Sequence, residues 1–181
     1  MAVIDIGHGA DTLPAGGISA GWTLLDLNNA ANDTGTLTSF EIYEPANCTG
    51  VKIGTFSGSG TTYTYRDHVL VGNVTGGSKQ TFSGVDCDVT TGDWIAFLNG
   101  TGDARDSGTG GAGLAYYEAD AFSAGSHTYT VAENYWLPIY GTGVTPGWTN
   151  ITKINGITAT DIAKVNGIAV ADIVKINGVA V

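Results

Sequence analysis

An 11-residue repeat at the end of the chain constrains its structure more than any other feature. From residue 151 the sequence reads ITKINGITATD, IAKVNGIAVAD and IVKINGVAV. The same step relates two sets of residues: Ile151, Ile162 and Ile173, and Lys153, Lys164 and Lys175. Each copy is too short to bury its own apolar side chains, so the repeat predicts units that stack on one another or seek a partner.

Each copy contains an Asn-Gly pair between β-branched residues, at Asn155-Gly156, Asn166-Gly167 and Asn177-Gly178. Both central residues of a type I′ turn need a positive φ, which Asn and Gly accept, so the repeat predicts three short hairpins. A helical alternative stays open, because an 11-residue apolar period also fits a right-handed coiled coil. Glycine in each copy opposes it. A short helical turn over Asp161–Val165, closed by Asn-Gly, is the other alternative.

Isolated hairpins have unprotected edges, which is a liability in a monomer. The simplest remedy is pairing with the same tail on neighbouring subunits, as a trimer or polymer. A meander folded back on its own domain is the alternative. The expected assembly residues are Ile151, Lys153, Ile154, Asn155, Gly156, Ile162, Lys164, Val165, Asn166, Gly167, Ile173, Lys175, Ile176, Asn177 and Gly178.

The residues before the repeat predict an all-β fold. Glycine is frequent, at 28 of 181 residues, and short runs rich in Val, Thr and Tyr alternate with turn-forming residues. Strands are expected at 3–7, 22–28, 36–44, 51–56, 63–71, 79–85, 87–90, 94–98, 113–119, 127–133 and 135–140. This pattern is typical of a jelly-roll-like β-sandwich, followed here by a short C-terminal β repeat tail. We expect the sandwich over 1–140, a Gly/Pro hinge over 141–150 and the tail over 151–181.

Net charge and hydropathy exclude some classes of binding partner. The net charge is −10, and the last 32 residues contain three Lys and two Asp. The excess of acidic residues therefore lies in residues 1–149, the body of the protein. An acidic body argues against nucleic acid or an anionic membrane as partner. The start MAVIDIGHGAD lacks the features of a secretory signal, and no apolar run is long enough to span a bilayer. Unless a leader has been removed, we expect export by assembly or lysis.

Two cysteines, Cys48 and Cys87, allow one disulfide or two small buried hydrophobic residues. Among polar motifs, His8 fits a polar N-terminal loop better than a metal site. His68 lies beside Arg66 and Asp67 and fits a polar strand end at the surface better than an acid/base group.

The loop over 99–108 is the best small-ligand candidate, because Asp103 and Asp106 with flexible carbonyls resemble Ca²⁺ ligands. Its spacing matches no calcium motif, so it is only a weak candidate and we expect no resident metal. The chain shows no nucleophile–base pattern and no phosphate loop, so we expect neither an enzyme nor a cofactor.

The adjacent residues Tyr116 and Tyr117 must point to opposite faces of a strand, so one of them could offer a surface for stacking on a sugar ring. Core packing is the other interpretation for the aromatic residues, and it suits Trp94, within WIAFL, best.

The repeat resembles the "KINGV" repeats at the ends of many bacteriophage structural proteins, over Lys153–Ile157, Lys164–Ile168 and Lys175–Val179. The stretches Val71–Phe82 and Val89–Ile95 are similar to β-sandwich modules in the same kind of protein. This resemblance implies a fibre, tail or capsid-decoration protein. Together with the repeat, it predicts a non-enzymatic structural subunit in a virion or extracellular assembly, whose partners are itself and other structural proteins. A carbohydrate-binding module, with glycans as partners, and an extracellular filament subunit joined by its C-terminal strands are the alternatives.

Overall fold

The computed structural model describes residues 3–10, 20–101 and 107–145, together with six two-residue strands of the tail. Every regular element in these ranges is a strand, which confirms the all-β prediction. No helix among the described residues is long and apolar enough to cross a membrane.

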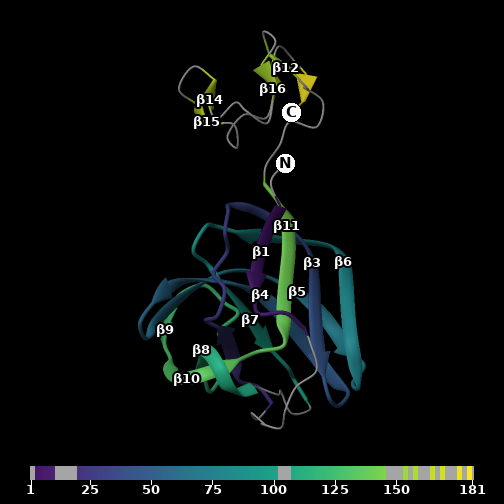
Figure 1. Cartoon of the computed structure of the whole chain (residues 1–181), viewed down its shortest axis with the longest axis vertical. Helices are drawn as coiled ribbons and strands as arrows, with labels where there is room; N and C mark the ends of the chain where they lie inside the picture. The colour runs from purple at the N-terminus through teal and green to yellow at the C-terminus, as the bar shows by residue number, and fades with distance from the viewer. Residues whose placement is uncertain are drawn as a thin grey trace.

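Two antiparallel sheets form the body, and strands β1, β11, β3 and β6 lie side by side in Figure 1. The four-stranded sheet has the order β1 (Val3–Gly7), β11 (Ile139–Val144), β3 (Gly35–Glu44) and β6 (Ser78–Val89). The seven-stranded sheet has the order β10 (Thr130–Trp136), β8 (Ser107–Tyr117), β2 (Thr23–Asp26), β7 (Trp94–Leu98), β4 (Cys48–Ser59), β5 (Thr62–Val74) and β9 (Ser126–Thr128). The predicted β-sandwich is confirmed, whereas the jelly-roll connectivity stays a prediction.

The main core lies between the two sheets. Ile4 and Ile6 of β1 are fully buried there, while Val3 and Asp5 alternate toward the other side. Phe40 of β3 and Ile53 of β4 belong to the same cluster. Burying one such side chain stabilises a fold by about 1.5–3 kcal/mol, so this cluster accounts for much of the stability of the sandwich.

A second apolar cluster contains residues from the seven-stranded sheet and from the segment after β8. It contains Leu25, Phe56, Tyr63, Ala96, Leu98, Ala115, Ala121, Phe122 and Tyr129. Leu24 belongs to the core between the sheets, whereas its neighbour Leu25 belongs to this second cluster. Central strands covered on both faces read as continuous apolar runs, which explains the motifs WTLLD and WIAFL.

The predicted strands over 79–85 and 87–90 form one strand, β6. Ser39 pairs with Ser83 and Leu37 pairs with Cys87, so three residues of β6 face a single residue of β3. Gly84 has φ of +74° at this bulge. A bulge bends a strand and breaks its alternation without ending it, which is why the sequence reads as two strands.

The expected strands near 127–140 are divided differently from the prediction. β9 ends at Thr128, β10 runs from Thr130 to Trp136, and β11 begins at Ile139. Two register shifts interrupt the pairing of β10 with β8, one on each side of Asn134, and Asn134 has φ of +67°. This irregular backbone obscures the period-2 pattern on which the prediction depended.

Residues 141–144 are part of the sandwich and not of the predicted hinge. They form the second half of β11, where Val144 pairs with Val3 on one side and with Thr36 on the other. Their glycines reflect close packing: a Cβ on Gly143 would lie 2.2 Å from the Thr36 carbonyl oxygen, and one on Gly141 would lie 2.8 Å from Ile6 Cγ2. Of the predicted hinge, residues 146–150 lie outside the described residues.

The tail contains three two-stranded sheets. The strands are β12 (Lys153–Ile154) with β13 (Ile157–Thr158), β14 (Lys164–Val165) with β15 (Ile168–Ala169), and β16 (Lys175–Ile176) with β17 (Val179–Ala180). The predicted hairpin arrangement is therefore present in each copy. Lys164 and Val165 are in a strand, so the alternative of a helical turn reaching these residues is wrong.

Cys48 and Cys87 are both buried, and neither is in a disulfide. Of the two interpretations of the sequence, the one with two small buried hydrophobic residues is therefore correct.

Candidate functional site

The three hairpins of the tail repeat one pairing register. Lys153 pairs with Thr158, and Ile154 pairs with Ile157, the pair that flanks Asn155-Gly156. The second and third hairpins pair in the same way at a step of 11 residues, as Val165 with Ile168 and Ile176 with Val179. The chain therefore builds the same backbone unit three times.

Six predicted assembly residues lie in these strands: Lys153, Ile154, Lys164, Val165, Lys175 and Ile176. The other nine lie outside the described residues: Ile151, Asn155, Gly156, Ile162, Asn166, Gly167, Ile173, Asn177 and Gly178.

Among the described residues, none of the three small sheets has a third strand. Each strand therefore has one edge without a ladder partner in this part of the chain. A two-stranded hairpin is at best marginally stable alone in water, and a free edge is a template for pairing with another strand. The described strands of each hairpin thus have edges at which another strand could pair.

The outer edge of β1 in the body, unlike the edges of the hairpins, is covered by hydrogen bonds from another segment of the chain. Asn32 accepts a hydrogen bond from the Asp5 N–H at 3.0 Å through Oδ1 and donates through Nδ2 to the Val3 carbonyl at 3.3 Å. The Asn32 N–H donates to the Asp5 carbonyl, and the Gly7 N–H donates to the Asn29 carbonyl. Asn29 Nδ2 donates to the Gly7 carbonyl at 3.3 Å. The segment containing Asn29 and Asn32 therefore occupies the edge that another strand would need.

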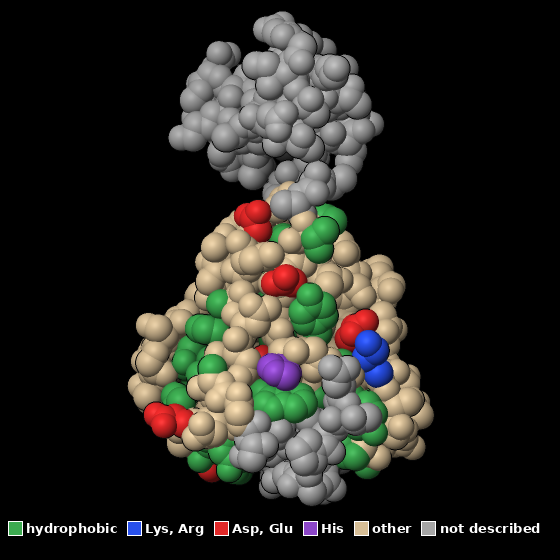
Figure 2. All heavy atoms as spheres, viewed as in Figure 1, with side chains coloured by type: hydrophobic (Ala, Val, Ile, Leu, Met, Phe, Trp, Pro, Cys, Tyr) green, Lys and Arg blue, Asp and Glu red, His purple; other side chains and the backbone are tan. Residues whose placement is uncertain are grey.

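Large exposed hydrophobic residues are few on the described part of the body. They are Val3, Leu70, Val131 and Val144. On the face in Figure 2, hydrophobic side chains form small separate groups and not one continuous patch. The described residues on this face therefore form no broad apolar area of the kind that marks a large permanent interface.

Tyr116 and Tyr117 do contact opposite sides of the seven-stranded sheet. Tyr116 packs against the core between the sheets and stacks on Trp22, with ring centroids 5.3 Å apart. Tyr117 packs against the second cluster, with its centroid 4.7 Å from His127 and 5.6 Å from Tyr129. Both rings are half-buried. Trp94 is also half-buried and packs against the second cluster, as expected for a core residue.

Asp103 and Asp106, the calcium candidates, lie outside the described residues. Within the described part of the chain, no group of three or more His, Cys, Asp or Glu residues could hold a metal ion. His8 is exposed and stacks on Trp136, with centroids 4.2 Å apart.

His68 is half-buried and not a simple polar strand end. Its Nδ1 lies 2.8 Å from the Tyr65 hydroxyl, and its ring contacts Phe122 edge-on at 5.4 Å. Burial and the nearby Lys52 ammonium lower the pKa of His68, while the carboxylates of Asp67 and Asp120 act in the opposite direction.

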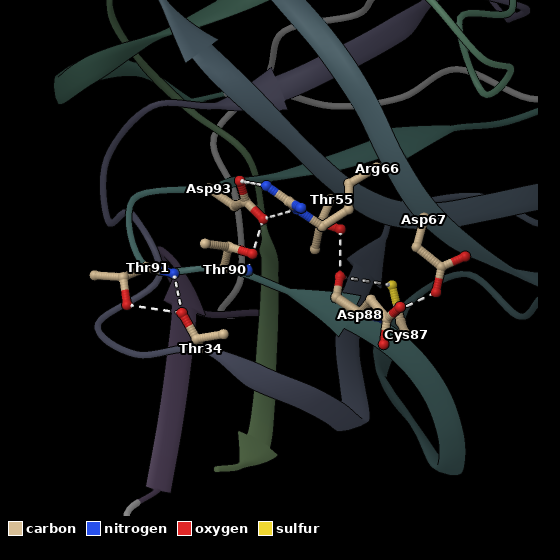
Figure 3. A network of polar contacts seen from close by, with 9 residues as sticks. All are labelled: Thr34, Thr55, Arg66, Asp67, Cys87, Asp88, Thr90, Thr91 and Asp93. Atoms are coloured by element: carbon tan, nitrogen blue, oxygen red, sulfur yellow. Dashed lines mark hydrogen bonds and ion pairs between the residues drawn. The ribbon is translucent and has the colours of Figure 1, made fainter. Parts of the chain in front are cut away.

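A polar network joins β4, β5, β6 and the turn before β7, as Figure 3 shows. Arg66 forms a bidentate ion pair with Asp93, whose side chain is only 2% exposed. Asp93 also accepts the Thr90 N–H at 2.7 Å. Asp67 accepts the Asp88 N–H at 2.8 Å, and Thr55 donates to the Asp88 carbonyl. The contacts of Asp93 fix the turn before β7.

Asp26 is a buried acid that sequence analysis missed. Its Oδ1 accepts the Leu137 N–H at 3.1 Å and a hydrogen bond from Asn28, while Oδ2 has no hydrogen-bond partner. Burial raises the pKa of Asp26 to about 6 against these hydrogen bonds. The signal was its place within the apolar run LLDL. Asn28 also donates to the carbonyls of Gly113 and Tyr135, so the pair joins β2 to β8 and β10.

The described residues thus define an antiparallel β-sandwich with a tail of three repeated hairpins. Comparison with protein-family models and with curated proteins finds no match to this chain.

Proposed function

We propose that the chain is a non-enzymatic structural subunit of a bacteriophage virion, as a fibre, tail or capsid-decoration protein. The sandwich is displayed outward, and the three hairpins join subunits to one another or to other structural proteins. The observation that carries this proposal is the contrast between edges: the hairpins have unpaired edges among the described residues, while β1 is capped by Asn29 and Asn32.

A jelly-roll-like connectivity belongs to the same proposal. Strands β1, β11, β3 and β6 form one sheet, while β2, β7, β4 and β5 are consecutive neighbours in the other. Two groups of four antiparallel strands, with chain connections that cross between them, are typical of an eight-stranded jelly roll. In this proposal β8, β9 and β10 are an insertion between the last two of the eight strands.

The test is the mass in solution, by light scattering, of the full chain and of residues 1–145. We expect the full chain to form a trimer or larger assembly and the shorter chain to be a monomer. A discrete trimer would favour a fibre or decoration protein, and an open polymer would favour the filament alternative. A monomeric full chain would refute self-assembly.

A full-length variant tests the tail contacts without deleting the tail. Ile154→Glu, Val165→Glu and Ile176→Glu together place a charge at the same position of each hairpin. We expect this triple variant to be monomeric with an unchanged sandwich, as seen by near-ultraviolet circular dichroism. Val3→Glu, an exposed valine on β1, is the matched control and should leave the assembly intact.

The carbohydrate-binding alternative depends on a free aromatic face. The rings of Tyr116 and Tyr117 are half-buried and already contact Trp22 and His127, respectively. A glycan array with the wild type and with Tyr117→Ala distinguishes the two functions. A specific glycan bound by the wild type and lost in the variant would favour the sugar-binding module.

A further inference from the structure

The segment between β8 and β9, residues 118–125, forms a strap. The two strands that it connects lie in the seven-stranded sheet with β2, β7, β4 and β5 between them. Within the strap only Ala121 and Phe122 are buried, and the other residues are exposed. The strap therefore enters the second apolar cluster through two side chains.

Polar contacts attach the strap to three strands of this sheet, β2, β4 and β5. Thr23 of β2 donates to the Ala119 carbonyl at 2.8 Å and accepts the Ala121 N–H at 2.9 Å. Lys52 of β4 pairs with Asp120 at 2.5 Å. On β5, the Tyr65 N–H donates to the Gly125 carbonyl at 3.2 Å. The contacts with β4 and β5 are single polar anchors of a kind that can open locally. Thr23 holds the strap through its hydroxyl and also through its backbone N–H, which donates to the Ala119 carbonyl at 3.2 Å.

Phe122 fills the space between these anchors. Its ring contacts Phe56 at 5.3 Å and His68 at 5.4 Å, both edge-on. The Lys52 ammonium lies 6.0 Å from the centre of the same ring. His68 therefore packs directly against the buried side chain that holds the strap down.

We propose that closure of the strap depends on a neutral His68, so that protonation of this ring releases residues 118–125 from the sheet. The groups that face His68 are Lys52 on β4, Tyr65 and Asp67 on β5, and Asp120 on the strap. Protonation adds a second positive charge near Lys52 in a half-buried aromatic site.

The direction of the pH effect follows from the number of protons that the closed and open forms of the strap bind. Burial and Lys52 lower the pKa of His68 in the closed strap, against Asp67 and Asp120. Lys52 and Asp67 lie on the sheet in both forms, so opening removes the burial under Phe122 and the carboxylate of Asp120. Burial is the largest influence on the His68 pKa and Asp120 the smallest, so opening brings this pKa nearer its ordinary value of 6.5. The open form therefore binds more protons once the pH falls below that value, and acidification favours opening. The Asp120 pKa is lowered: burial opposes this, but hydrogen bonds from Lys52 and the Phe122 N–H outweigh it. The carboxylate thus stays charged while His68 titrates.

The test is amide hydrogen exchange of the full-length protein from about pH 8 to about pH 5, corrected for the intrinsic effect of pH. We expect the amides of Ala121 and Phe122 to lose protection on acidification, while those of β7 keep theirs. His68→Gln should remove this loss, because the amide can still bond Tyr65 and carries no charge. His8→Gln, which changes an exposed histidine elsewhere, should behave as wild type. An unchanged loss in His68→Gln would overturn the proposal.

A titration of the unmodified protein keeps the proposal testable if the variant does not fold. We expect the nuclear magnetic resonance midpoint of His68 to lie below 6.5 and to coincide with a change in the Phe122 ring signals. A midpoint at or above 6.5, or Phe122 signals that do not follow it, would refute the proposal. Neither experiment depends on the tail, so its outcome is independent of the proposed assembly function.

Discussion

Asn32 and Asp5 are joined by two hydrogen bonds along the outer edge of β1, one donated by each backbone N–H. Asn32→Ala removes the side-chain acceptor of the Asp5 N–H and the donor to the Val3 carbonyl. Because both bonds lie at the exposed edge, we expect a loss of about 1–2 kcal/mol in the free energy of unfolding in urea. The Asp5 amide should also exchange faster with solvent. Asn73→Ala, at an exposed position on β5, is the control and should change neither quantity.

The buried ion pair of Arg66 with Asp93 predicts a large loss of stability when Arg66 is replaced. Arg66→Ala leaves the Asp93 carboxylate buried with the Thr90 N–H as its remaining hydrogen bond in this network. The Arg66 side chain is 32% exposed, which moderates the penalty, so we expect destabilisation by about 2–3 kcal/mol.

Lys79→Ala is the comparison for Arg66→Ala, because the Lys79–Glu41 pair lies at the surface, with side chains 46% and 31% exposed. It should cost less than about 1 kcal/mol in the same urea unfolding experiment. Equal losses in the two variants would contradict the importance assigned to burial of Asp93.

Asp26 predicts a pH dependence of stability. Its pKa is raised from 3.8 to about 6 in the folded protein, so the folded state holds a proton that the unfolded chain releases. This contribution is fully present below 3.8 and is lost as the pH rises through about 6. A shift of this size corresponds to about 2–3 kcal/mol.

Asp26→Asn should therefore gain stability relative to wild type at pH values well above 6, with the advantage shrinking on acidification. Urea unfolding over a pH series measures both curves. Parallel curves for variant and wild type would show that Asp26 does not titrate in this range.

Substitution of Gly143 tests whether residues 141–144 form a strand or a hinge. Gly143→Ala places a methyl group 2.2 Å from the Thr36 carbonyl oxygen and 2.7 Å from the Leu37 Cα, so the backbone must shift. We expect destabilisation of about 1–3 kcal/mol in thermal or urea unfolding. Thr142→Ala, at the neighbouring half-buried position, is the control. A neutral Gly143→Ala would indicate that β11 does not extend this far.

The sequence predicted those parts of the fold that depend on local pattern. The limits of β1 and β7 agree with the expected 3–7 and 94–98, and each Asn-Gly pair lies between two short paired strands. The sandwich follows from many short alternating runs with turn residues between them.

The rest depends on contacts between distant residues. Asn32 lies 27 residues from Asp5, and Asn28 lies 107 residues from Tyr135, so no local pattern links them. The glycines of 141–144 suggested flexibility, whereas two of them allow close approach of neighbouring groups. Phe122 and His68 are brought together only by the path of the strap.

The pairing of Val144 with Val3 and Thr36 marks one pole of the sandwich. The chain leaves the sandwich toward the tail at this pole. Glu44 pairs with Ser78 at the opposite pole, beside the turns at 45–47 and 75–77. If the tail tethers the subunit, every copy is held by the same pole. The turns at 45–47 and 75–77 then lie at the pole of the sandwich opposite to this attachment.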